Sequence, residues 1–239
     1  MQNHQVVSRE DWLVARMEHL AKEKEFTRLR DQLSAERRDL PWVRIEKAYL
    51  FDSGTGKQSL ANLFGDKRQL IVYHFMFGPD WEEGCPSCSF WADNFNGIGV
   101  HLNHRDTVLV AISRAPVELL EAYRQRMGWS FPWLSSLQSD FNQDYQVSYP
   151  AEAAKQGETI YNYRNGEFSG QELPGISVFY RAEDGTIYHT YSAYARGLDM
   201  LNGAYHFLDL TPKGRDEANL SWSQAWLQRH DQYDTQHYG

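Results

Sequence analysis

The chain has few cysteines: two among 239 residues, Cys85 and Cys88. This excludes the small secreted domains that several disulfides hold together. The sequence also lacks any run of 18 apolar residues, so we expect no membrane-spanning helix. Acidic residues outnumber basic ones by 32 to 24, and the net charge of −8 argues against a nucleic-acid partner. The first residues show no basic stretch followed by an apolar one, so we expect a cytoplasmic protein rather than a secreted one.

What the sequence does contain is enough apolar material for a full core. Of its residues, 41% are hydrophobic and 14% aromatic. A chain of 239 residues suits one elaborated domain with extensions. We expect an N-terminal helical extension over residues 1–40, the main domain over 41–212 and a C-terminal tail over 213–239.

The N-terminal extension has a helical pattern. Ser8 is a suitable N-cap, and residues 9–38 predict one long helix or two short ones. Two apolar stripes are out of phase, which predicts a break or bend near residues 22–25. The alternating charges are typical of a solvated helix face, and a dimerisation arm is the alternative. The stripes comprise Leu13, Met17 and Leu20, then Phe26, Leu29 and Leu33.

In the main domain, strand and helix patterns alternate. Residues 69–77 and 107–112 are apolar runs typical of strands buried on both faces. Alternation of this kind predicts an α/β fold, a mixed sheet with helices on both faces. Further expectations are a helix over 116–127, an edge strand or turn over 131–134, a short helix over 141–147, an inserted hairpin or loop over 150–172, a strand hairpin over 176–191, a helix over 198–208, and an amphipathic piece around Trp222 and Trp226.

The two cysteines form a Cys-x-x-Cys pair that follows a buried strand and opens a predicted helix. One such pair cannot complete a zinc site, which needs four ligands, so we expect no metal. Donors at a helix start favour a thiolate, which predicts Cys85 as the nucleophile. Cys88, one turn further on, could then resolve a mixed disulfide, and Pro86 is tolerated at the first helical position. His74 is predicted to be a core histidine, with proton shuttling near Cys85 as the alternative.

A resemblance to a known family rests on these motifs. The strand–loop–Cys-x-x-Cys–helix order resembles the thioredoxin superfamily, and the wider pattern resembles its peroxiredoxin-type branch. The segment 74–95 and the segments 189–197 and 208–212 resemble the bacterial thioredoxin-like family DUF899. The resemblance implies a thioredoxin-like mixed central sheet flanked by helices, with an N-terminal helical extension and a C-terminal helical tail.

The resemblance also implies a substrate groove. Pro174 corresponds to the cis-proline of thioredoxin-like proteins, which would expose the backbone of Leu173 to an extended substrate. Trp81 and Pro86 would line the same groove beside Cys85. The sequence departs from peroxidases because Glu82 stands where they carry Thr or Ser, and because residues 172–179 contain no arginine. Glu82 and its neighbour Glu83 would raise the pKa of a nearby thiol.

The leading hypothesis is a dithiol–disulfide oxidoreductase that uses Cys85 and Cys88 and needs no cofactor. Its partner would be a disulfide-containing protein or a small thiol substrate. One alternative is a thiol peroxidase with Cys85 as the peroxidatic residue. Another is a non-enzymatic binding or redox-sensing module, in which the N-terminal helix and the tail form a partner or homo-oligomer surface.

Overall fold

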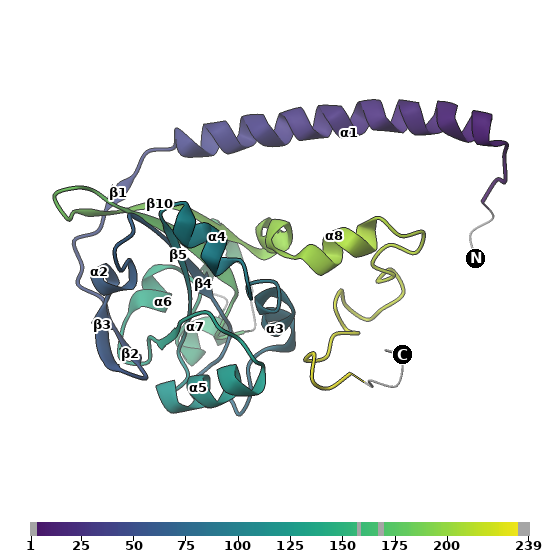
Figure 1. The fold of residues 1–239 in the computed structure, drawn as a ribbon. Coiled ribbons are helices and arrows are strands. Elements are labelled where there is room, and N and C mark those ends of the chain that lie inside the picture. Colours follow the sequence, from purple (N-terminus) through teal and green to yellow (C-terminus); the bar gives the residue numbers. More distant parts are fainter. Residues whose placement is uncertain (1–3, 157–158, 167–169, 234–239) are drawn as a thin grey trace. The chain divides into compact units, whose positions relative to one another are not determined.

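A computed structural model describes residues 4–156, 159–166 and 170–233 of the chain. The chain divides into two compact units, residues 1–41 and residues 42–239. The first unit consists of helix α1 and its flanking residues, and the second contains the sheet, the remaining helices and the C-terminal segment (Figure 1).

Helix α1 (Arg9–Arg38) is continuous over 30 residues. The hydroxyl of Ser8 accepts a hydrogen bond from the Asp11 N–H at 3.1 Å, which confirms the predicted N-cap. The expected break near residues 22–25 is wrong. Those positions hold Lys and Glu, which are good helix formers. The helix therefore continues through the point where the apolar residues shift from one face to another. None of the helix side chains is buried within this unit.

The second unit is built on an eight-stranded mixed sheet with the order β1-β10-β9-β4-β5-β6-β2-β3. The three strands β4, β5 and β6 run parallel, and β9 pairs antiparallel with β4 (Figure 1). This is the thioredoxin-like mixed sheet that the resemblance implies. The strand bounds are β1 Val43–Arg44, β2 Leu50–Ser53, β3 Gly56–Ser59, β4 Gln69–His74, β5 Thr107–Ser113, β6 Trp133–Ser135, β9 Gly175–Arg181 and β10 Ile187–Tyr194.

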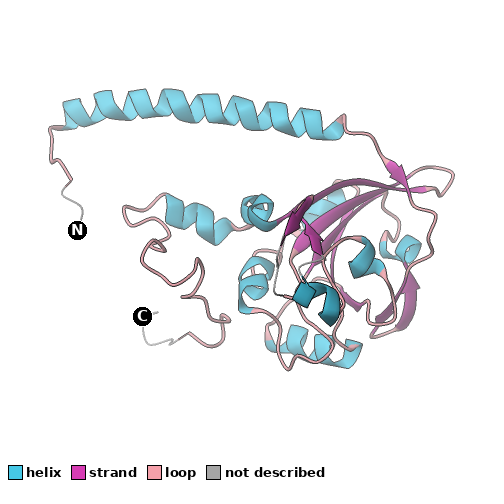
Figure 2. Cartoon of the chain, turned by 180° about the vertical axis from the view of Figure 1, so that it is seen from behind, coloured by secondary structure: helices cyan, strands magenta, loops and turns pink. Residues whose placement is uncertain are grey.

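Helices cover both faces of this sheet. One face carries α3 and α5, and the other carries α2 and α6 (Figures 1 and 2). Helix α8 packs against α3, where Tyr205 contacts Phe90 and Trp91. Side chains of β4 alternate between the two cores: Tyr73 joins the core under α3, whereas Leu70 and Val72 join the opposite one. The helix bounds are α2 Leu60–Leu63, α3 Pro86–Ala92, α4 Gly99–His104, α5 Val117–Arg126, α6 Phe141–Asp144, α7 Ala151–Gln156, the 3-10 helix η1 Ala195–Leu201 and α8 Gly203–Asp209.

Several boundaries differ from the sequence prediction. Strand β6 is an interior strand between β5 and β2, so the expectation of an edge strand or turn is wrong. The helix expected over 198–208 is split, because Asn202 leaves helical geometry and caps α8 by accepting from the Tyr205 N–H. Residues 150–172 contain α7 and a separate hairpin of β7 (Thr159–Tyr161) and β8 (Arg164–Gly166); residues 157–158 and 167–169 lie outside the described residues.

The described part of the C-terminal segment, residues 210–233, contains no helix, so the expected amphipathic helical piece is wrong. Side-chain contacts fix the segment instead. The indole of Trp226 donates to Glu217 at 2.8 Å and meets Phe90 of α3 edge-on at 5.6 Å. Among the described helices, none is long and apolar enough to cross a membrane.

Candidate functional site

The loop from β4 to α3 is held close to the core. The Trp81 ring covers Gly78, where an added Cβ would lie 2.8 Å from the indole Nε1. At Gly84, an added Cβ would lie 2.7 Å from the Phe75 ring, so only glycine fits without a shift. The next residue, Cys85, donates its N–H to the Met76 carbonyl at 3.1 Å. These contacts place Cys85 directly over the end of β4.

The two cysteines differ in exposure. Cys85 is the residue before α3 and is partly exposed, whereas Cys88 lies one turn further on and is 2% exposed. Pro86 occupies the first helical turn, as predicted. Residues three apart on a helix share a face, so both thiols point to the same region.

The surroundings separate the two thiols electrostatically. Hydrogen bonding from the Cys88 thiol is the largest cause that lowers the pKa of Cys85, to about 7, with help from the backbone N–H groups of Cys88 and Ser87. Burial raises the pKa of Cys88 above its usual value. Two groups donate to the Cys88 sulfur: the Met76 N–H at 3.4 Å and the Tyr73 hydroxyl. The arrangement favours a thiolate at Cys85 and a protonated, buried thiol at Cys88.

A cavity of about 240 Å³ lies beside Cys88. Pro174 lines it, so the structure brings Pro174 and Cys88 together, as the resemblance implied. Trp81 and Pro86, predicted for the same groove, do not line this cavity; the Trp81 ring instead covers Gly78. The remaining walls are Tyr73, Met76, Ser87, Trp91, Ala195, Arg196, Leu198, Asp199 and Gln224.

The expected cis bond before Pro174 is wrong, since the described residues contain no cis peptide bond. The backbone around Pro174 is already paired within the chain. The Leu173 N–H donates to the Val147 carbonyl at 2.8 Å, and the Pro174 carbonyl accepts from the Tyr161 hydroxyl at 2.6 Å. These groups are therefore not free to pair with an extended substrate.

Glu83 was expected to raise the pKa of a nearby thiol, and its surroundings oppose that effect. Its carboxylate forms ion pairs with Arg126 of α5 and with Arg229, the latter at 2.8 Å. Two guanidinium groups thus offset the charge of this carboxylate, which stands two residues before Cys85. The charge balance of the loop depends on residues far away in the sequence.

Sequence reasoning missed three residues that contact the cysteine segment. Ser89 donates to the Cys85 carbonyl at 2.9 Å, and Tyr123 lies 3.0 Å from the Ser89 hydroxyl. Arg229 donates to the Gly84 carbonyl at 2.7 Å. No local signal marks Arg229, because it lies in a segment without helix or strand.

His74 does not face the cysteines. It packs against Phe141 and Tyr145 on the opposite face of the sheet, and its Nε2 lies 2.8 Å from the Ser177 hydroxyl. The prediction that His74 is a core residue is confirmed, although its partner is a hydroxyl rather than a backbone carbonyl and its buried Nδ1 has no hydrogen-bond partner among the described residues. The proton-shuttle alternative is wrong. Within the described residues, no group of three or more His, Cys, Asp and Glu side chains could hold a metal ion.

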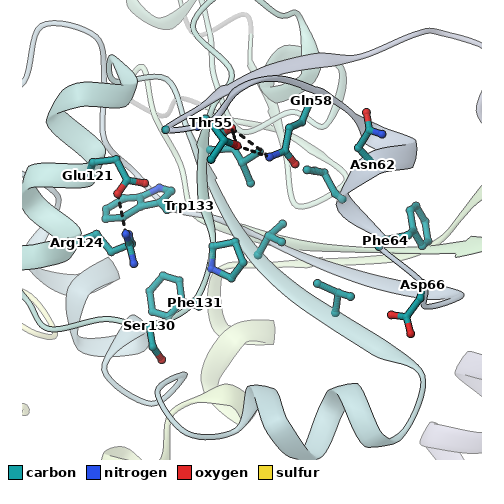
Figure 3. Close-up of a pocket in the computed structure, with 18 residues that line it drawn as sticks. Thr55, Gln58, Asn62, Phe64, Asp66, Glu121, Arg124, Ser130, Phe131 and Trp133 are labelled. Atoms are coloured by element: carbon teal, nitrogen blue, oxygen red, sulfur yellow. Dashed lines mark hydrogen bonds and ion pairs between the residues drawn. The ribbon is translucent and has the colours of Figure 1, made fainter.

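A second, larger cavity of about 640 Å³ lies elsewhere in this unit (Figure 3). Thr55 and Gln58 of the β2–β3 hairpin stand on one side of it, and the ion pair of Glu121 with Arg124 of α5 stands on the other. Neither cysteine lines this cavity, so it is separate from the thiol site.

One comparison with known proteins shows a family. The model of the family described as "Bacterial protein of unknown function (DUF899)" matches residues 1–233. Nothing among the curated proteins matches this chain. Among solved structures, the chain is similar to peroxidoxin BcpB from Mycobacterium tuberculosis, with 13% identity, a TM-score of 0.47, and coverage of 68% of this chain and 96% of that one. It is also similar to a mutant of peroxiredoxin Q from Xanthomonas campestris, with 16% identity, a TM-score of 0.44, and coverage of 72% and 94%.

Proposed function

Since this chain belongs to the bacterial family DUF899, we propose its function from the cysteine site itself: a dithiol–disulfide oxidoreductase. Cys85 is the nucleophile and Cys88 the resolving thiol. One observation carries the proposal: a partly exposed thiol stands directly before helix α3, and a buried thiol lies one helical turn further on, with the Met76 N–H donating to its sulfur. That asymmetry is what thiol–disulfide exchange needs.

The reaction has two steps. The Cys85 thiolate attacks one sulfur of a substrate disulfide, which forms a mixed disulfide and releases the first substrate thiolate. Cys88 then loses its proton and attacks the Cys85 sulfur, which forms the Cys85–Cys88 disulfide and releases the second substrate thiolate. Two electrons pass from the protein to the substrate, and an external dithiol must return them for another turnover.

The buried donors support the second step. Cys88 is costly to ionise because it is 2% exposed. The Met76 N–H and the Tyr73 hydroxyl both donate to its sulfur, and such bonds favour the thiolate over the thiol. These donors would lower the barrier to resolution without making Cys88 the first nucleophile.

A turnover assay with single-cysteine variants tests the proposal. The reduced protein should reduce insulin or hydroxyethyl disulfide when a dithiol donor is present. Cys85→Ser should abolish turnover, and Cys88→Ser should accumulate a mixed disulfide at Cys85, seen by mass spectrometry. The matched control is the double variant Cys85→Ser, Ser130→Cys. It keeps two thiols in the chain but loses the Cys85–Cys88 pair, so it should be inactive. Unchanged turnover in Cys85→Ser would overturn the proposal.

Two further assays separate the alternatives. The reduced protein should consume hydrogen peroxide more slowly than it reduces disulfides. Faster peroxide consumption, with a sulfenic acid at Cys85, would instead favour a thiol peroxidase. Absence of both reactions, together with a partner captured equally well by the double Cys→Ser variant, would favour a binding module.

A further inference from the structure

Arg229 reaches the cysteine loop from the far end of the chain. Its Nη2 donates to the Gly84 carbonyl at 2.7 Å, its Nε donates to the Tyr123 hydroxyl at 2.8 Å, and its Nη1 pairs with Glu83 at 2.8 Å. The side chain is 13% exposed. One guanidinium group thus contacts a backbone carbonyl, a tyrosine hydroxyl and a carboxylate in or beside the loop before Cys85.

The hydrogen bonds form a chain with one direction. Ser89 uses its only proton to donate to the Cys85 carbonyl, so it must accept from the Tyr123 hydroxyl. Tyr123 in turn accepts from Arg229. The chain therefore runs from Arg229 through Tyr123 and Ser89 to the Cys85 carbonyl. Because Ser89 and Tyr123 are buried, breaking the chain would leave polar groups without a partner.

The neighbours of Arg229 keep it in place. His230 lies 2.7 Å from Asp93 at the end of α3, and Asp231 pairs with Arg126 of α5. Three consecutive residues of the C-terminal segment therefore contact three different positions around the cysteine helix. Such a set of contacts fixes the segment more firmly than one exposed ion pair would.

We propose that Arg229 is a positioning residue of the thiol site: it holds the Gly84–Cys85 backbone in place and offsets the charge of Glu83 beside the nucleophile. The C-terminal segment is thereby part of the site rather than an appendage. This inference rests on the proposed function in taking Cys85 as the reactive thiol. It goes beyond it in assigning a role to a residue 144 positions away from that thiol.

Several other titratable or charged groups lie on the elements around the cysteine loop. They come from every element packed around the loop: Cys88 on α3, Tyr73 on β4, Glu82 and Glu83 in the loop, Tyr123 and Arg126 on α5, and Arg229 in the C-terminal segment. Of these, Arg229 alone contacts both Glu83 and the backbone next to Cys85. Its removal would leave Glu83 with one guanidinium instead of two, and the less balanced negative charge in the loop would disfavour a thiolate at Cys85.

The test is the pH dependence of Cys85 alkylation by iodoacetamide in the full chain, followed by mass spectrometry. Arg229→Met should move the midpoint upward by about half a pH unit or more, which slows alkylation about threefold at pH 6.5. The limiting rate at high pH should stay close to that of the wild type. Arg229→Lys keeps the positive charge but loses the planar guanidinium group, so its midpoint should fall between those of the wild type and Arg229→Met.

Arg215→Met is the matched control. Arg215 is similarly shielded, pairs with Asp199 and Asp209, and makes no hydrogen bond to the cysteine loop. Its removal should lower stability without moving the midpoint. An unchanged midpoint in Arg229→Met, or an equal shift in Arg215→Met, would overturn the proposal. The alkylation midpoint is measured without turnover. The role of Arg229 can therefore fail this test while the protein still reduces disulfides, and it can pass the test in a protein that reduces none. If Arg229→Met does not fold, the test is made with Arg229→Lys: an upward shift of its alkylation midpoint supports the proposal, and an unchanged midpoint overturns it.

Discussion

The Met76 N–H points at the sulfur of Cys88, 3.4 Å away. Met76 lies just beyond the end of β4, the strand that also carries Tyr73, whose hydroxyl donates to the same sulfur. The central strand and the segment directly after it therefore supply two donors to the buried thiol, and Cys88 supplies one to the partly exposed thiol. The order of these hydrogen bonds assigns different chemistry to two identical side chains.

The first prediction concerns the order in which the thiols react. In the native reduced protein, iodoacetamide should label Cys85 and leave Cys88 unlabelled, because Cys88 is buried and its pKa is raised. The rate at Cys85 should be half-maximal near pH 7 and fall about tenfold for each pH unit below that. Peptide mapping before and after denaturation measures both. Equal labelling of the two thiols in the native state would contradict the assignment of roles.

The second prediction concerns Tyr73. Tyr73→Phe removes one donor from the Cys88 sulfur, and a hydrogen bond of this kind is worth about 1 kcal/mol. The mixed disulfide at Cys85 should then live about fivefold longer, while the rate of its formation stays unchanged. Rapid-quench measurements separate these two steps. Tyr149→Phe is the control: its hydroxyl lies within hydrogen-bond distance of the Gln146 and Ile160 carbonyls and has no bond to either thiol, so its loss should alter neither step.

The third prediction concerns the loop before the nucleophile. Gly84→Ala would place a methyl group 2.7 Å from the Phe75 ring, a steric clash that typically costs about 1–3 kcal/mol. Urea unfolding should show that loss. Gly99→Ala is the matched control, because no atom lies within 4 Å of its added Cβ. If the two variants are equally stable, the loop does not pack against the core as described.

Much of this fold was predictable because the signals are local. The apolar run over residues 69–77 predicted the central strand, and β4 occupies Gln69–His74. The Cys-x-x-Cys spacing predicted a helix after Cys85, and α3 begins at the next residue. Each prediction depended on residues that are neighbours in the sequence.

The parts that failed depend on distant contacts. Strand β6 has three residues, too few to show a period, and only its neighbours β5 and β2 make it an interior strand. Arg229 carries no motif, and its place next to Gly84 follows from contacts with α3 and α5. The cis-proline expectation came from resemblance rather than from local sequence, and the described residues contain no cis peptide bond.

The fourth prediction concerns acid stability. Burial lowers the pKa of His74 from 6.5 to about 3. Below pH 6.5 the unfolded chain binds a proton at this residue and the folded chain does not, so stability falls as the pH decreases toward 3. The loss between pH 6.5 and 4.5 should be about 2 kcal/mol. Urea titrations at the two pH values measure it.

His74→Gln should lose less stability over the same interval, because glutamine does not titrate. His101→Gln, at an exposed position on α4, should behave like the wild type. The pKa of His189 is also lowered by burial, so some acid sensitivity should remain in His74→Gln. Identical pH dependence in His74→Gln and the wild type would contradict the account of His74.

The most direct measurement of the central claim is a glutathione redox titration of the full chain, followed by tryptophan fluorescence and checked by thiol alkylation. Trp91 lies three residues beyond Cys88 in α3 and belongs to the same core, so its emission should report the state of the pair. The account predicts a reversible two-electron transition between Cys85 and Cys88, with a midpoint between about −120 and −270 mV. A pair that forms no disulfide under oxidising conditions, or one that glutathione cannot reduce, would contradict it.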